Sequence, residues 1–522
     1  MNIITWSWIF LFLYIALMLA IGVLGSRRVR NADDFATARG GYGPVFLAFA
    51  FAATTASGAT FLGGPGLAYE LGLASVWGGF LYPIGVYFGV LISMRLIAKS
   101  GNRLGCRSIA EYLGQRYQSD GIRIMVSLFS LVLFFYLAGQ LVSGLVMFET
   151  MLGLSPFWAL IITTVVLLFY VVMGGAHADI LTDGIQGMMM LLVATTVILL
   201  VAFGAGLDGG FSELWSNLTA QEPSLVEAVN PSSALTHSWW SIIAILFACI
   251  PLGLLPHLGN KLWALRDLSK QGTFLKLAFS FGMVLGMMVV GGLLARGLLG
   301  GALLEEDATT NQALPLLFIE VFPTWLAALI GMGVLAAIMS TADGLVVSTS
   351  QIVANDLYRL TISPRLRNPP TGTRLDGQVL KISRVTTIIV LLLTMVMAWG
   401  LMDTNIALII WIGIGGLMAA FAGPLVMGAL WKGVTRAGAY AGLASGFTVF
   451  VVLHSQWIDP EWFGQGGSIY SVATWIHDEG PNPHSCAAIG EAVSLVATFL
   501  VSKFSQPLPE AHLRKLFSGP EE

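Results

Sequence analysis

Long apolar runs recur along the whole chain, from residue 6 to residue 503, and shorter polar segments separate them. Each run has about 18 to 28 residues, the length that an α-helix needs to cross the hydrocarbon core of a bilayer. The pattern therefore predicts thirteen membrane-spanning helices, near residues 6–25, 44–70, 74–96, 123–152, 156–174, 180–205, 239–258, 273–297, 321–348, 384–402, 406–430, 437–455 and 486–503. No polar segment between them is long enough for a soluble core, so we expect one membrane domain over residues 1–522.

Basic residues gather in alternate loops, in step with the predicted helices. With the N-terminus outside, the cytoplasmic side carries all 26 Lys and Arg except Arg296, in the segments 27–39, 95–123, 261–276, 359–384, 432–436 and 503–515. Because cytoplasmic loops are rich in Lys and Arg, we expect an outside N-terminus and a cytoplasmic C-terminus. The outer loops 206–237 and 455–486 contain no Lys or Arg, and their tryptophans indicate short interfacial pieces, at Trp215, Trp457, Trp462 and Trp475.

Two of the predicted helices contain residues that break a helix. Residues 53–66 read A-T-T-A-S-G-A-T-F-L-G-G-P-G, and residues 249–257 read C-I-P-L-G-L-L-P-H, with Gly and Pro that destabilise a helix interior. Backbone freed by such a break is tolerated at membrane depth only where it is buried in protein or lines a water-filled cavity. The two breaks therefore indicate a transport site.

The positions of the breaks also predict an internal repeat. The first opens a five-helix unit over residues 44–206, and the second opens another over residues 239–430. Because five is an odd number, the two units cross the membrane in opposite senses, as inverted repeats of secondary transporters do. We expect an all-α polytopic fold in which residues 1–43 form a leading helix and cytoplasmic loop, and residues 437–522 form two accessory helices and a tail.

Composition excludes a soluble protein, because 56% of the residues are hydrophobic and only 11% are charged, against about a quarter charged in soluble domains. The first apolar run has no basic residue before it and Arg27 directly after it, the reverse of a signal peptide, so we expect a retained helix. Cys106, Cys249 and Cys486 are too scattered for a disulfide framework or a thiolate metal site. The sequence shows no P-loop, zinc-helix or nucleophile motif, and we expect no enzymatic activity.

Hydroxyl groups share one face of the predicted helix 321–348. It contains A-A-I-M-S-T-A-D-G at 336–344, where Ala337, Ser340 and Thr341 follow i, i+3, i+4 spacing. A hard cation such as sodium needs several oxygen ligands, and carbonyls freed near the first break are the kind of ligand that holds coupling ions. The spacing alone fits equally a helix whose Ser and Thr bond to their own backbone or to a neighbouring helix.

The chain resembles the sodium:solute symporters over nearly its whole length. The resemblance rests on four motifs in order: residues 53–66, G-G-A-H-A-D-I-L-T-D-G-I-Q-G at 174–187, L-P-H at 255–257, and residues 336–344 leading to N-D-L-Y at 355–358. It implies the two inverted five-helix repeats of the leucine transporter and sodium as the coupling ion. It also implies a sodium site formed by the carbonyls of Ala53, Ala56 and Ala337 and the hydroxyls of Ser340 and Thr341.

Two acidic residues leave two interpretations open. Asp183 matches a family aspartate on the inward path of the ion, which some sialic acid relatives use at a second sodium site, and Asp343 stands where those relatives have a hydroxyl residue. One interpretation is a second ion between Asp183, Ser340 and Asp343. The other is an inner carboxylate that is hydrated or paired with Lys or Arg, since a buried carboxylate is costly without a partner. Thr55 departs from the proline transporters, which have an essential aspartate there.

The substrate site is expected around the two breaks. Ser57, Gly58, Thr60 and Leu252 belong to them, and Tyr136 and Gln140 lie at i, i+4 spacing in the helix 123–152. Tyr136 and Gln140 fit a brace between helices equally well, and His257 is expected to be structural or gating.

The sequence looks most like the sodium/pantothenate and sodium/proline branches of the family, and Ala248 and Leu252, where proline relatives carry aromatics, argue against proline. A helix N-terminus at a break suits a carboxylate.

These observations predict a sodium-coupled symporter of a small organic carboxylate, such as pantothenate or a monocarboxylate, which works by alternating access in the inner (plasma) membrane. Proton coupling is the alternative within the same class, kept open by Asp183 and Asp343. A different class is a transporter-like membrane sensor, which would need a partner protein because the tail after Phe504 is only about twenty residues long. We expect lipid contacts and no nucleic-acid partner.

Overall fold

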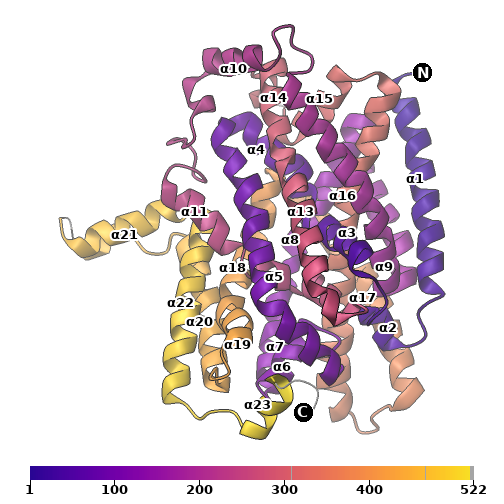
Figure 1. Cartoon of the computed structure of the whole chain (residues 1–522), viewed down its shortest axis with the longest axis vertical. Coiled ribbons are helices and arrows are strands. Elements are labelled where there is room, and N and C mark those ends of the chain that lie inside the picture. Colours follow the sequence, from indigo (N-terminus) through magenta and orange to yellow (C-terminus); the bar gives the residue numbers. More distant parts are fainter. Residues whose placement is uncertain (307, 465, 518–522) are drawn as a thin grey trace.

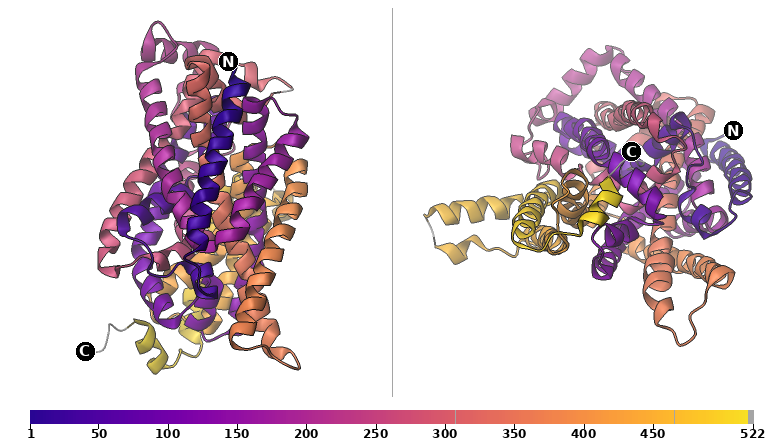
Figure 2. Two further views of the ribbon diagram at one scale, coloured as in Figure 1. Left: turned by 90° about the vertical axis from the view of Figure 1, so that its right-hand side faces the viewer. Right: turned by 60° about the horizontal axis from the view of Figure 1, so that its bottom comes forward.

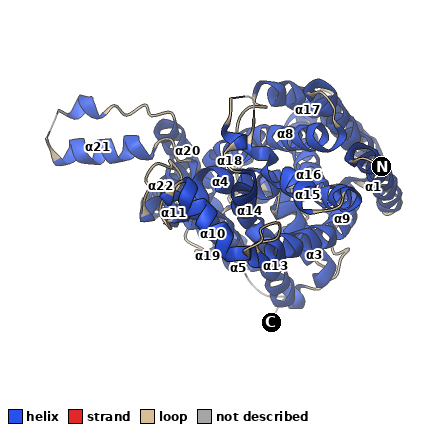
Figure 3. Ribbon diagram, turned by 90° about the horizontal axis from the view of Figure 1, so that it is seen from above, coloured by secondary structure: helices blue, strands red, loops and turns tan. Residues whose placement is uncertain are grey.

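The computed structural model describes residues 1–306, 308–464 and 466–517, and every regular element in these ranges is a helix (Figures 1 and 3). The helices run roughly parallel to the long axis of the molecule, and α1, at the start of the chain, begins at the opposite end of the bundle from α23, the last described helix (Figures 1 and 2). We call these two ends the N-terminal end and the C-terminal end of the bundle. This arrangement agrees with a chain that crosses a membrane an odd number of times.

Ten helices in the described ranges are long and apolar enough to cross a membrane, and the count is eleven when one bent pair is taken as a single span. Each of the thirteen predicted ranges falls on helical structure. Two of them are shortened by a break or a kink, which leaves the short apolar helices Pro44–Thr55 and Pro156–Leu168. The number thirteen and the division into two repeats therefore stay predictions.

The remaining helices follow the predicted order. Their bounds are α1 Ile3–Ser26, α2 Ala32–Thr37, α5 Val76–Leu104, α6 Ile109–Arg116, α7 Asp120–Phe129, α8 Leu133–Leu152, α9 Pro156–Phe203, α10 Gly210–Gln221, α13 Gln271–Gly286, α14 Val290–Leu299, α15 Ala313–Val321, α16 Thr324–Gln351, α17 Gly372–Gly400, α18 Ile406–Phe421, α19 Gly428–Leu430, α20 Arg436–His454, α21 Ser468–Glu479, α22 Pro483–Phe504 and α23 Glu510–Phe517.

The first break lies where the motif at 53–66 predicts it. Helix α3 (Pro44–Thr55) ends at Ala56, whose backbone is extended, and a wide helical turn η1 (Ala59–Gly63) then leads into α4 (Gly64–Leu71). Pro65 stands in the first turn of α4, where its missing N–H group costs no helical hydrogen bond. The chain thus crosses as two half-helices joined by a short non-helical segment.

The second break is a bend of 52° between the segments Trp239–Leu254 and Pro256–Ala264. Helix α11 (Trp239–Ala248) gives way to the short turn η5 (Leu252–Leu254), and α12 (Pro256–Gly259) begins the second half. Pro251 directly precedes η5, and Pro256 starts α12, so neither position can continue the preceding helix.

The predicted helices 156–174 and 180–205 form one long helix, α9, with a kink at Gly175. The φ angle of Gly175 is +53°, and a Cβ atom there would lie 2.6 Å from Phe35. Only glycine tolerates both the positive φ and this close approach.

Helix α16 lies at the centre of the bundle, because every residue from 330 to 351 is buried. It packs against α1, α3, α8, α9 and α17. The accessory helices α20 and α22 pack against α18 on one side of the bundle, and α21 projects sideways next to them (Figures 1 and 3). The two breaks and α16 are therefore enclosed by other helices.

Candidate functional site

A cavity of about 90 Å³ lies between the two breaks. Its wall includes four of the predicted substrate residues, Ser57, Thr60, Tyr136 and Leu252. The wall also includes residues from the N-terminal ends of α5, α18 and α22 and from the segment that precedes α11: Ser75, Gly78, Gly79, Leu235, Thr236, Ala407 and His484. The cavity thus extends from the breaks toward the N-terminal end of the bundle.

Three aromatic rings on the cavity wall, Tyr82, Trp411 and His484, contact one another. The Trp411 ring packs on His484 at a centroid distance of 4.5 Å and meets Tyr82 edge-on at 5.4 Å. The Tyr82 hydroxyl donates a hydrogen bond of 2.6 Å to the carbonyl of Thr55, at the end of α3. A helix outside the predicted repeats, α22, is thereby connected through ring contacts to the first break.

Gly58 and Gln140 lie behind the cavity wall. The backbone N–H of Gly58 donates to Oε1 of Gln140 over 3.0 Å, and Gln140 is fully buried. A Cβ atom on Gly58 would lie 2.1 Å from the hydroxyl oxygen of Ser143. Gln140 therefore binds the backbone of the break, as a brace between helices would, and its contact with a substrate stays a prediction.

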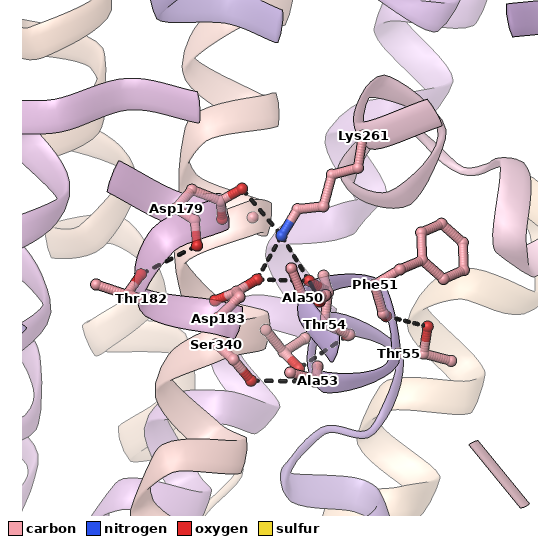
Figure 4. Close-up of polar contacts among 12 residues, drawn as sticks. Ala50, Phe51, Ala53, Thr54, Thr55, Asp179, Thr182, Asp183, Lys261 and Ser340 are labelled. Atoms are coloured by element: carbon pink, nitrogen blue, oxygen red, sulfur yellow. Dashed lines mark hydrogen bonds and ion pairs between the residues drawn. The ribbon is translucent and has the colours of Figure 1, made fainter. Parts of the chain in front are cut away.

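The proposed ion ligands come together where α3 meets α16 (Figure 4). The Ser340 hydroxyl lies 3.0 Å from the carbonyl oxygen of Ala53 and 3.1 Å from that of Ala337. The Thr341 hydroxyl lies 3.0 Å from the carbonyl oxygen of Thr54.

All these groups are buried, and the hydroxyls can turn their lone pairs toward a cation. The donor set is made of neutral oxygens, which suits a hard monovalent ion. Ala56, the remaining predicted ligand, is the residue at which α3 ends.

One cationic side chain lies directly beside this oxygen cluster. The Lys261 ammonium contacts Asp183 and lies 2.9 Å from Asp179 Oδ2 and 2.5 Å from the Thr54 hydroxyl (Figure 4). The Thr54 hydroxyl in turn lies 2.6 Å from Asp183. Lys261 is only 4% exposed, so the structure corrects its assignment to a cytoplasmic loop: it belongs to the second half of the bent span, which carries it into the bundle.

The three side chains around Lys261 agree with one of the two interpretations of Asp183, an inner carboxylate paired with a basic residue. Asp343 is buried in α16, one turn after Ser340. Whether Asp183, Ser340 and Asp343 also bind a second ion stays a prediction.

His257 stands between the main cavity and a second, smaller one. Its ring meets Tyr136, which lines the main cavity, edge-on at 5.4 Å. The smaller cavity, of about 10 Å³, is lined by Asp179, His257, Asn260 and Lys261, among others. This position fits the predicted structural or gating role of His257.

Sequence reasoning missed Asp179, Lys261, Trp411 and His484 as members of the site. A signal existed for Lys261, which stands four residues after His257 within the same broken span, and for Asp179, which stands one helical turn before Asp183. His484 had no local signal, because its helix reaches the cavity only through tertiary packing.

An all-helical bundle with two interrupted spans, a cavity between them and buried oxygens beside it is the architecture of a secondary transporter. The chain belongs to the sodium:solute symporter family, whose model matches residues 35–446. It is therefore a multi-pass membrane protein of a family of transporters, which are not enzymes, and its activity is sodium-coupled transport of a solute.

Named relatives cover most of the chain. The sodium/pantothenate symporter of Haemophilus influenzae is 29% identical over 78% of this chain and 81% of its own length. The sodium/pantothenate symporter of Escherichia coli is 28% identical over 84% of this chain and 89% of its own length. Sodium/proline symporter 2 of Staphylococcus saprophyticus is 25% identical over 96% of this chain and 93% of its own length.

Solved structures support the fold. A sodium-coupled sialic acid symporter in a substrate-bound outward-open state matches with a TM-score of 0.71 and 21% identity over 96% of this chain and 98% of its own. A nucleobase-cation-symport-1 family transporter in a closed conformation matches with a TM-score of 0.52 and 14% identity, over 92% of this chain and 97% of its own.

Proposed function

We propose that the protein imports a small organic carboxylate together with sodium, and that the solute binds in the cavity between the two breaks. The observation that carries the proposal is the contact of Ser340 and Thr341 with the carbonyls of Ala53 and Thr54, directly before the first break. An ion bound among these oxygens would join α3 to α16 and set the shape of the segment that contains Ser57, which lines the cavity.

The cavity wall supports a carboxylate as the solute. Its described lining residues include no Asp or Glu, and they offer the hydroxyl of Thr60 and the rings of Trp411 and His484. An acidic wall would repel an anion, whereas neutral donors bind a carboxylate by hydrogen bonds. Two of the named relatives are pantothenate symporters, and pantothenate is itself a small carboxylate.

The position of the two cavities supports alternating access as the mechanism. With the N-terminal end outside, the main cavity lies on the outer side, and the ion pairs of Lys261 with Asp179 and Asp183 lie between the ion ligands and the cytoplasm. Inward opening must separate Lys261 from these carboxylates. Because sodium and solute favour the same closed arrangement of the first break, each raises the affinity of the other.

The proposal is tested with purified protein in liposomes. Thermal unfolding in sodium or potassium, with pantothenate, lactate, proline and galactose, first identifies a ligand, since a ligand of the folded state raises its stability. Uptake of that ligand is then measured with and without a sodium gradient. We expect uptake to require sodium, and Ser340→Ala with Thr341→Ala to weaken the apparent sodium affinity by roughly tenfold or more, as expected for about 1.4 kcal/mol of lost ligation.

Thr349→Ala is the matched control, because the Thr349 hydroxyl bonds only to Leu345 of its own helix. Uptake at the same rate with and without a sodium gradient would contradict the proposal. So would an unchanged sodium dependence of uptake in the Ser340→Ala, Thr341→Ala double variant. A sugar as the only stabilising ligand would contradict the carboxylate but leave sodium coupling intact.

Proton coupling remains the second candidate, because two buried carboxylates share one lysine beside the proposed ion site. Uptake into liposomes under a proton gradient, in the absence of sodium, distinguishes proton coupling from sodium coupling. If the proton gradient drives uptake in the wild-type protein, and Asp183→Asn abolishes that uptake, protons replace sodium as the coupling ion.

A further inference from the structure

A second large hollow lies on the opposite side of the bent span from the central cavity. This groove has a volume of about 490 Å³ and lies between α11, α22 and η13 (Ala422–Met427), the wide helical turn that follows α18. It shares no lining residue with the central cavity, although both border the second break: Leu252 faces the central cavity, whereas Ile250 and Pro251 face the groove.

The groove opens to the hydrocarbon part of the bilayer. Phe247 and Leu430 on its wall are 46% and 60% exposed and belong to membrane-spanning segments. The polar group of Trp240 is already occupied, because its indole N–H donates to the Ser485 hydroxyl over 2.6 Å. A ligand that enters this groove must therefore have an apolar body.

One ionisable side chain, Glu491, lies in this apolar wall. It is the ninth residue of α22, near the middle of the span, and it is only 5% exposed. Its Oε1 atom is buried without a hydrogen-bond partner, and no ion pair of Glu491 occurs in the part of the chain that the structure describes. It is also the one ionisable residue among the described lining residues of the groove.

A carboxylate at this depth is expensive and marks a functional site by default. A metal ion does not fit, because the groove offers one carboxylate, and hard cations need several oxygen ligands. A phospholipid headgroup does not fit either, since it would bring an anionic phosphate to the same depth as the Glu491 carboxylate, near mid-span. The cation that fits is an ammonium group carried into the hydrocarbon by its own alkyl chain.

We propose that this groove binds a single-chain amphiphilic amine, whose ammonium pairs with Glu491 and whose alkyl chain lies along Phe247, Met427 and Leu430. The pair would satisfy the buried carboxylate, and the chain would fill the apolar groove beside it. Because Ile250 and Pro251 line the groove, the amine would contact the second break from the side away from the solute.

The test measures equilibrium binding of radiolabelled dodecylamine to the full-length protein in nanodiscs of phosphatidylcholine. We expect saturable binding that unlabelled dodecylamine displaces and dodecanol, of the same length without the charge, does not. Glu491→Gln should weaken binding at least about tenfold, because it removes one partner of a buried charge pair. Glu149→Gln, at the C-terminal end of α8 and away from the groove, should leave binding unchanged.

A second variant separates a lost site from a damaged fold. Ala492→Trp retains Glu491 but fills the groove, and it should also abolish binding while size-exclusion and thermal unfolding profiles stay normal. Equal binding by wild type and Glu491→Gln, or full displacement by dodecanol, would overturn the proposal. Displacement by phosphatidylethanolamine added to the nanodisc would assign the site to a lipid headgroup and overturn the single-chain assignment. None of these measurements uses sodium or solute, so they are independent of the proposed transport function.

Discussion

Lys261 shows how much one buried charge determines around the ion path. Its ammonium lies among Asp179, Asp183 and the Thr54 hydroxyl, and all four side chains are buried. We predict that Lys261→Met lowers the free energy of unfolding by about 3 to 5 kcal/mol, because two carboxylates would remain without their cation. Asp183→Asn should cost much less, since the ion pair of Lys261 with Asp179 persists. Thermal unfolding of the purified variants in detergent measures both.

The double variant Lys261→Met with Asp183→Asn sharpens this prediction. It restores the net charge of the cluster, so it should be more stable than Lys261→Met alone, and the two changes should not add. Lys276→Met, an exposed lysine on α13, serves as the control and should be neutral. A Lys261→Met protein as stable as the wild type would mean that water satisfies both carboxylates.

At the scale of elements, the bundle depends on helices that approach closely at small residues. Where α5 crosses α13, a Cβ atom on Gly79 would lie 2.3 Å from the carbonyl oxygen of Gly286, and one on Gly286 would lie 2.2 Å from that of Gly79. Such close contacts stabilise helix packing in membranes, where burying apolar surface contributes little to the free energy of helix association. We predict that Gly79→Ala lowers stability by about 1 to 3 kcal/mol, because the backbones must separate.

The neighbouring glycine gives a matched control for this crossing. A Cβ atom on Gly78 would meet nothing within 4 Å. Gly78→Ala should therefore be neutral or stabilising by about 0.5 to 1 kcal/mol, the usual gain of alanine over glycine in a helix. Thermal unfolding of the Gly79→Ala and Gly78→Ala variants measures the two changes in stability. Equal changes would show that α5 and α13 can move apart without cost.

At the scale of the whole molecule, the orientation can be tested because the three native cysteines are buried. We predict that a single cysteine from Ser212→Cys, on α10, reacts with a membrane-impermeant maleimide in intact cells. One from Asn368→Cys, ahead of α17, should react only after permeabilisation, since three spans separate the two positions. The wild-type protein should label weakly in both cases. The reverse pattern would invert the orientation predicted from the basic loops.

Sequence patterns predicted the apolar helices and both breaks well, because Gly, Pro and hydroxyl residues act locally at 53–66 and 249–257. They misplaced Lys261, because a charge in a membrane protein is by default assigned to a loop, and only the partners Asp179 and Asp183 make its burial tolerable. They did not separate Gln140 as a brace from Tyr136 as a wall residue, because both lie on one helix face and the distinction depends on what packs against each.

The sideways position of α21 has a consequence for how the protein sits in the bilayer. The arm formed by η14 (Pro460–Phe463) and α21 projects from the helices α20 and α22 (Figures 2 and 3), and its Trp462 and Ile469 are 70% and 67% exposed. Tryptophan prefers the headgroup region, so we expect the arm to lie flat at the membrane surface. An arm held at that level resists tilting, which would leave α20 and α22 as a stationary support while the other helices rock during each transport cycle.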